Sequence, residues 1–119
     1  MPFILENLNV YQKAVAFADR ISGLTESFPK GKDYLADQLN RASLSIPANI
    51  AEGNGRFLPK DRRNFFVIAR GSAQECLSLL EVAKRRNLIT EEEHAELVED
   101  LEIIVKMISG LIRRENEKK

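Results

Sequence analysis

The side chains in this sequence that could do chemistry are few, and most of them stand among apolar residues. Glu52 and Glu75 could act as a general acid and base, but no nucleophile with a partner base accompanies them. His94 follows Glu91 in a Glu-x-x-His pair, and a di-metal site of that type needs a second such pair on another helix. Cys76 stands among Ala and Leu residues and is expected to be a small buried hydrophobe. The sequence therefore predicts no enzyme, no cofactor and no metal site.

A second set of polar residues is predicted to join helices. Residues 45–53 read Ser-Ile-Pro-Ala-Asn-Ile-Ala-Glu-Gly, and the proline removes one backbone hydrogen bond from a helical pattern. We predict that a glutamate of this set pairs with one of its arginines, and that Asn49 caps or crosslinks the kinked helix, because such groups are costly when buried unpaired. The alternative is that these polar side chains lie at the rim of the bundle and are solvated by water. The predicted network consists of Arg41, Asn49, Glu52, Arg70, Ser72 and Glu75.

Basic residues gather at both ends of the third expected helix. If the subunit repeats around a ring, each cluster becomes a belt that could hold RNA phosphates even at zero net charge. The alternative is a solvated surface, and cations near a helix C-terminus are favourable there in any case. The first cluster stands at the start of the helix, where the dipole disfavours cations, so the dipole does not explain its position. The candidate nucleic-acid-binding residues are Arg56, Lys60, Arg62 and Arg63 at the start, and Lys84, Arg85 and Arg86 at the end.

Four helices are expected to position these residues, because apolar residues recur at helical spacing and no alternating strand pattern occurs. Gly53-Asn54-Gly55 predicts a helix stop with a left-handed cap, and Thr90 with Glu93 predicts a capping box. Short links imply an all-α, antiparallel up-down-up-down four-helix bundle that forms one domain over residues 1–119. The expected helices span residues 8–28, 33–53, 59–87 and 91–114, with a fraying charged tail at 113–119.

The composition of the chain indicates a cellular compartment and argues against some kinds of partner. The chain has 119 residues, and 18 basic side chains balance 18 acidic ones. No apolar run approaches the ~20 residues of a membrane span, and residues 1–10 lack the features of a signal peptide. The single cysteine excludes an intrachain disulfide and fits a reducing compartment. We therefore expect a cytoplasmic protein with no membrane partner and no small-molecule substrate.

Apolar residues outside the main helical stripes predict self-association. A monomer buries one face of each helix, so additional apolar faces indicate another subunit. The alternative is a small bundle with a wide core face and a few exposed apolar residues. The candidate interface residues are Val10, Phe17 and Leu24 on the first helix, and Val98, Ile103, Val105, Met107 and Ile112 on the fourth.

Three blocks of the sequence resemble the bacterial four-helix-bundle family of S23 ribosomal, or 23S rRNA intervening-sequence, proteins. The first block is residues 8–14, the second runs from Gln38 and Arg41 through 45–53 to Arg56, and the third is 65–72 with Glu75. The resemblance implies a helical bundle that assembles as a ring-like homo-oligomer, typically a pentamer. It implies no established activity.

Two functions follow as hypotheses. The first is a non-enzymatic homo-oligomeric scaffold or adaptor that recognises another protein through its assembled surface. The second is an RNA- or DNA-binding oligomer that uses the basic clusters. The first predicts partner binding with little dependence on salt, and the second predicts a steep fall of binding with salt.

Overall fold

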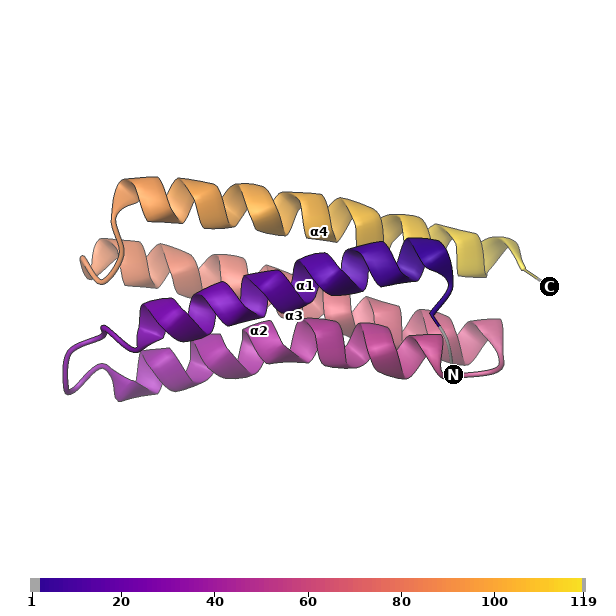
Figure 1. The fold of residues 1–119 in the computed structure, drawn as a ribbon, viewed down its shortest axis with the longest axis horizontal. Coiled ribbons are helices and arrows are strands. Elements are labelled where there is room, and N and C mark those ends of the chain that lie inside the picture. The colour runs from indigo at the N-terminus through magenta and orange to yellow at the C-terminus, as the bar shows by residue number, and fades with distance from the viewer. Residues whose placement is uncertain (1–2, 119) are drawn as a thin grey trace.

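Four antiparallel α-helices lie side by side in the computed structural model, which describes residues 3–118 except for the side chains of residues 5 and 6. The chain runs up, down, up and down, so both termini lie at the same end of the molecule as the α2–α3 turn (Figure 1). The fold is the predicted four-helix bundle. Its helices are α1 (Leu5–Thr25), α2 (Asp33–Asn54), α3 (Pro59–Arg85) and α4 (Glu91–Glu117).

The core forms where the apolar stripes of the four helices meet. On α4 the stripe repeats at steps of three and four residues, which keeps one seam facing the bundle. The prediction of an intersubunit role is wrong for Val10, Phe17 and Ile112, because these side chains are 0%, 2% and 7% exposed inside the core of a single chain. The other core residues on α4 are Leu97, Leu101, Ile104, Ile108 and Leu111.

The end of α2 differs from its predicted form. Gly55, the residue after the helix, has φ −81° and lies in the right-handed region, so the predicted left-handed cap is wrong. The glycine that matters is Gly53, which is buried inside the helix. A Cβ atom there would lie 2.7 Å from Cε1 of Phe66 and 3.0 Å from the carbonyl oxygen of Arg62. The missing side chain therefore allows α2 and α3 to approach closely.

Both ends of α4 are defined by side chains. At the start the predicted capping box is confirmed, because Glu93 N donates to Thr90 Oγ1 at 3.0 Å and Thr90 N donates to Glu93 Oε1 at 2.9 Å. At the other end the predicted fraying from residue 113 is wrong. The helix continues to Glu117, and Glu115 is buried. Lys119 lies outside the described residues.

The four helices pack unequally around the bundle. The helices that follow one another in the chain pack closely, whereas α1 and α4 touch over a smaller surface. Two ion pairs from Arg20, to Glu96 and to Asp100, bridge α1 and α4 toward one end. Among residues 3–118, no helix is both long and apolar enough to cross a lipid bilayer.

Candidate functional site

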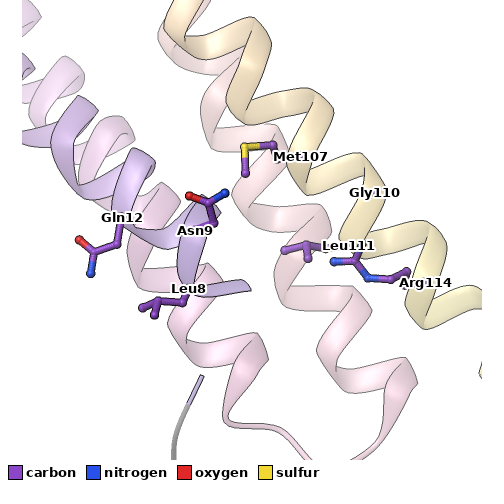
Figure 2. Close-up of a pocket in the computed structure, with 7 residues that line it drawn as sticks. All are labelled: Leu8, Asn9, Gln12, Met107, Gly110, Leu111 and Arg114. Carbon is purple, nitrogen blue, oxygen red and sulfur yellow. The ribbon is translucent and has the colours of Figure 1, made fainter. Parts of the chain in front are cut away.

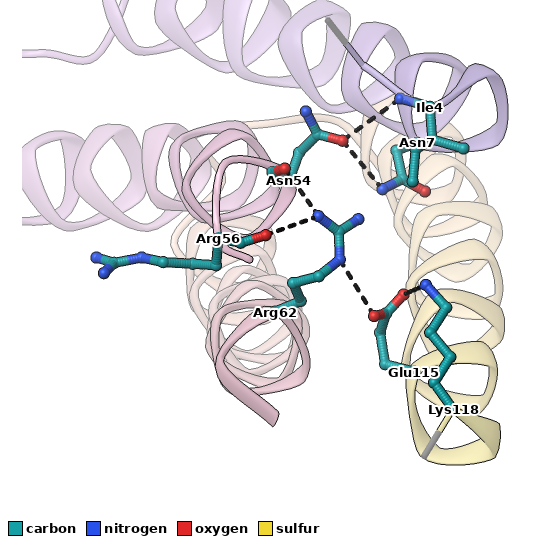
Figure 3. A network of polar contacts seen from close by, with 7 residues as sticks. All are labelled: Ile4, Asn7, Asn54, Arg56, Arg62, Glu115 and Lys118. Atoms are coloured by element: carbon teal, nitrogen blue, oxygen red, sulfur yellow. Dashed lines mark hydrogen bonds and ion pairs between the residues drawn. The ribbon is translucent and has the colours of Figure 1, made fainter. Parts of the chain in front are cut away.

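Arg62 at the start of α3 and Glu115 near the end of α4 are the two buried charged residues of the described chain. They are 7% and 6% exposed, and Arg62 Nε donates to Glu115 Oε1 at 3.1 Å (Figure 3). The second carboxylate oxygen accepts a hydrogen bond from Lys118 Nζ at 2.8 Å. A buried ion pair is costly unless its remaining polar atoms find partners, and among the described residues Arg62 Nη2 is buried without a hydrogen-bond partner. The pair therefore joins the first turn of α3 to the last turn of α4.

The same guanidinium also holds the turn between α2 and α3. Arg62 Nη1 donates to the carbonyl oxygen of Asn54 at 2.8 Å and to that of Arg56 at 3.1 Å. Carbonyls at a helix C-terminus lack partners within the helix, so these bonds satisfy groups that would otherwise need water. The prediction that Arg62 belongs to a nucleic-acid surface is wrong, because its donors point inward. The inward position of Arg62 can be read from its spacing in the sequence, since it precedes Phe66 by one helical turn on the buried face of α3.

The Asn54 side chain brings the N-terminal segment into this cluster. Its Oδ1 accepts hydrogen bonds from Asn7 Nδ2 at 3.3 Å and from the backbone N of Ile4 at 3.4 Å. Figure 3 shows these groups around the Arg62 side chain, with Glu115 and Lys118 on the opposite side. Asn54 is itself only 4% exposed. The start of α1, the α2–α3 turn and the end of α4 are thus tied together by buried polar groups.

The other basic residues remain at least partly exposed, at the two ends of α3. Arg56 pairs with Glu52 at 2.9 Å and lies over the Phe65 ring, whereas Lys60 is exposed. At the other end of α3, Lys84 and Arg85 pair with the carboxylate of Glu81. The hydrogen bond from Arg85 and the charge of Lys84 lower the pKa of its carboxyl group. The remaining predicted residues are Arg63, which donates to Asn116 Oδ1 at 2.9 Å, and Arg86, which is exposed.

The predicted polar network is wrong in its ion pairs. Glu52 pairs with Arg56 of its own segment, and Arg70 donates to Ser109 Oγ at 3.3 Å. Arg41 and Glu75 are exposed, and within residues 3–118 neither forms an ion pair. Water solvates both charges, so burial does not force them to find a partner.

A chain of uncharged hydrogen bonds joins α2 and α3 instead. Asn49 Nδ2 donates to Ser45 Oγ at 3.0 Å, and the Ser45 and Ser72 hydroxyl oxygens lie 2.8 Å apart. Ser72 Oγ in turn donates to the carbonyl oxygen of Ile68 at 3.1 Å. Asn49 also donates to the Ser45 carbonyl at 2.8 Å. Asn49 therefore bonds to Ser45 of its own helix, and Ser45, which the prediction did not include, makes the contact with Ser72 of α3.

The turn between α2 and α3 exposes two large apolar side chains. Phe57 is 89% exposed and Leu58 is 54% exposed. Pro59 follows at the first position of α3, where its fixed φ suits a helix start. Large apolar side chains exposed side by side on an ordered turn are unusual for a surface that meets only water.

Several grooves run along the outside of α4, and two of them are large. The first lies between α1 and α4 and has a volume of about 600 Å³, and Figure 2 shows Met107 and Leu111 pointing from α4 toward α1. Its other lining residues are Leu8, Asn9, Gln12, Gly110 and Arg114. The second lies over α3 and α4 and has a volume of about 820 Å³. It is lined by Gln74, Leu77, Glu99, Glu102, Ile103, Val105, Lys106, Ser109 and Arg113.

Part of the predicted oligomer interface coincides with these grooves. Ile103 is 41% exposed, and Val105 and Met107 are half-buried, so all three can contact another molecule. Val98 and Leu24 are half-buried as well and lie outside the two grooves. The open side of α4 is therefore one of the places where the single chain leaves apolar surface uncovered, and Leu44 on α2 and Val67, Ile68 and Val82 on α3 are exposed as well.

The remaining candidate groups for chemistry are buried or paired. Burial, and secondarily the charge of Glu75, raise the pKa of the Cys76 thiol to about 12, so the thiol stays protonated at neutral pH. His94 Nε2 lies 3.5 Å from Glu81 Oε1. Across residues 3–118, no three His, Cys, Asp or Glu side chains are grouped so that they could hold a metal ion.

Comparisons with known proteins agree with this architecture. A crystal structure from Bacteroides thetaiotaomicron, of a protein of unknown function from the S23 ribosomal protein family, superposes with a TM-score of 0.85. It is 28% identical and covers 91% of this chain and 98% of its own. No curated protein matches the sequence significantly. The family model for the 23S rRNA-intervening sequence protein matches residues 6–110, and the chain therefore belongs to that family.

Proposed function

We propose that this protein is a non-enzymatic scaffold or adaptor that works as a homo-oligomer, with its subunits meeting along the open side of α4. The observation that carries the proposal is the placement of Ile103, Val105 and Met107 in surface grooves although the core of the chain is already closed. Apolar surface gathered in this way is typical of an interaction site. A ring of five subunits is the expected assembly, and a cytoplasmic location fits the single unpaired cysteine.

The proposal is tested by the mass of the purified protein in solution. Light scattering after size exclusion should give a mass of about five times the 13.5 kDa of one chain. Ile103→Lys should lower that mass, because a charge would have to be desolvated in the contact. Val82→Lys is the matched control, since Val82 is 42% exposed on α3 and lines neither groove. A wild-type protein that remains a monomer at tens of micromolar contradicts the proposal.

A second candidate function is RNA binding by the exposed cations. The supporting observation is that Lys60 and Arg86 are exposed at opposite ends of α3, so a ring would repeat both positions. Binding to phosphates releases counterions, so the affinity should fall steeply as salt rises. A labelled structured RNA is titrated at low and at physiological salt. Lys60→Gln with Arg86→Gln should weaken binding and reduce the salt slope, and no binding at either salt would exclude this function.

A further inference from the structure

The α2–α3 turn is held rigidly although it lies at the end of the bundle. The buried Arg62 side chain binds the carbonyl oxygens of Asn54 and Arg56, and Glu115 fixes the guanidinium from α4. The turn therefore presents Phe57 without the freedom of an ordinary loop. A side chain that is fixed before binding loses less conformational entropy when it binds.

The same turn carries a positive charge in an unfavourable place. Lys60 is exposed in the first turn of α3, where the helix dipole disfavours cations. It stands two residues after Leu58, so the turn combines an aromatic ring, an aliphatic side chain and an ammonium group. We call Phe57, Leu58 and Lys60 the apolar–basic tip. Aromatic side chains at the centre of a contact commonly supply most of its binding energy.

The groove over α3 and α4 has the complementary chemistry. Leu77, Ile103 and Val105 supply apolar surface, and Glu99 and Glu102 supply negative charge at the end nearer the start of α4, whereas Lys106 and Arg113 line the other end. Both glutamates are exposed, and neither forms an ion pair within the part of the chain that the structure describes. The groove between α1 and α4 lacks this match, because its one charged lining residue is Arg114. An apolar ligand with a positive charge beside it is thus favoured by the end of the α3–α4 groove that holds Glu99 and Glu102.

We infer that the apolar–basic tip of one copy docks into the α3–α4 groove of a second copy, with Phe57 on the apolar surface and Lys60 facing Glu99 or Glu102. This inference rests on the proposed homo-oligomer and specifies which surfaces meet. The contact uses two different patches of the same chain, so it is heterologous and leads to a ring or an open chain of subunits. Each subunit then gives its tip to one neighbour and its groove to the other.

The first experiment mixes two variants with complementary defects. Phe57→Ser removes the aromatic ring of the tip and leaves the groove, and Ile103→Lys damages the groove and leaves the tip. Each variant alone should be a monomer by native mass spectrometry. An equimolar mixture should give a dimer of twice 13.5 kDa, because one intact tip still meets one intact groove. An interface formed by two identical patches gives no such rescue.

The second experiment reverses the charges. Lys60→Glu should raise the subunit dissociation constant by about tenfold or more, the effect of placing like charges together. Glu99→Lys or Glu102→Lys in the same chain should restore assembly. The matched controls are Arg41→Glu and Leu44→Ser, since both residues are exposed on α2 away from the tip and the groove. Neither control should change the mass.

The outcomes separate this inference from the function on which it rests. A monomeric wild-type protein contradicts both. A wild-type oligomer that keeps its mass in Phe57→Ser, or that shows no dimer when the two monomeric variants are mixed, overturns the tip-in-groove contact and leaves the scaffold standing. If Phe57→Ser keeps the mass and instead abolishes RNA binding, the tip contacts nucleic acid and the inference is wrong.

Discussion

Gly53 on α2 and Phe66 on α3 are in such close contact that a methyl group on Gly53 would come within 2.7 Å of the aromatic ring. Gly53→Ala should destabilise the protein by about 1–2 kcal/mol, since the clash exceeds the gain in helix propensity. Thermal unfolding followed by circular dichroism measures the change.

Gly71 on α3 offers the matched control for that substitution. It is exposed, and a Cβ atom there would have no neighbour within 4 Å. Gly71→Ala should therefore stabilise the protein by about 0.5–1 kcal/mol. Equal shifts of the melting temperature in the two variants would contradict the close approach of α2 and α3.

Removal of the buried arginine should be far more damaging than removal of its neighbour. Arg62→Met leaves the Glu115 carboxylate buried with Lys118 alone and should cost about 3–5 kcal/mol. Arg63→Met removes only a surface hydrogen bond to Asn116 and should cost about 1 kcal/mol or less. Urea denaturation monitored at several concentrations gives both values.

A double variant that replaces both charged side chains by Met distinguishes the effect of the charges from the effect of side-chain packing. Arg62→Met with Glu115→Met removes both charges, so no carboxylate is left uncompensated. It should recover much of the stability that Arg62→Met loses. If the double variant is less stable than Arg62→Met, the hydrogen bonds from Arg62 to the turn carbonyls are worth more than the charge pair.

The Ser45–Ser72 contact should show as a coupling energy between α2 and α3. Single changes to Ala break the same hydrogen bond, so a double-mutant cycle should give a coupling of about 1 kcal/mol. Ser78 is exposed on α3, and a cycle between Ser45→Ala and Ser78→Ala is the control. A coupling near zero for the Ser45–Ser72 pair would mean that each hydroxyl finds another partner at no cost.

The Cys76 thiol should be unreactive in the folded protein. Burial raises its pKa to about 12, so the thiolate that attacks disulfide reagents is scarce near neutral pH. Labelling with an aromatic disulfide reagent should proceed at the rate of global opening and become fast in denaturant. Rapid stoichiometric labelling without denaturant would contradict the buried position.

The same pKa shift makes stability depend on alkaline pH. In the unfolded chain the thiol ionises near its ordinary value of 9.0, whereas the folded thiol holds its proton up to about 12. The folded state therefore binds more protons in this window, and stability falls as pH rises from 9 toward 12. Cys76→Ala should remove this part of the slope, and denaturant unfolding of the two proteins at stepped pH tests it.

Much of the fold was accessible from periodicity and caps. The four apolar stripes predicted the bundle, and Thr90 with Glu93 fixed the start of α4. The Arg62–Glu115 pair was not predicted, because charge suggested surface positions: Arg62 was assigned to a nucleic-acid surface and Glu115 to a fraying tail. Their spacing places both on the buried faces, one turn from Phe66 and from Leu111. The ion pairs proposed for Arg41 and Glu75 failed because spacing locates a face of a helix but does not determine whether long charged side chains meet.

The loose packing of α1 against α4 has a consequence for the order in which the bundle assembles. That contact joins segments at opposite ends of the sequence, so closing it costs the most chain entropy, and the fewest side chains compensate for the loss. The three contacts between consecutive helices are local and form at lower entropic cost. The bundle should therefore fold as a row of adjacent hairpins that closes last along α1 and α4. The same seam should open first, which makes the amide protons of α1 the earliest to exchange with solvent among the helices.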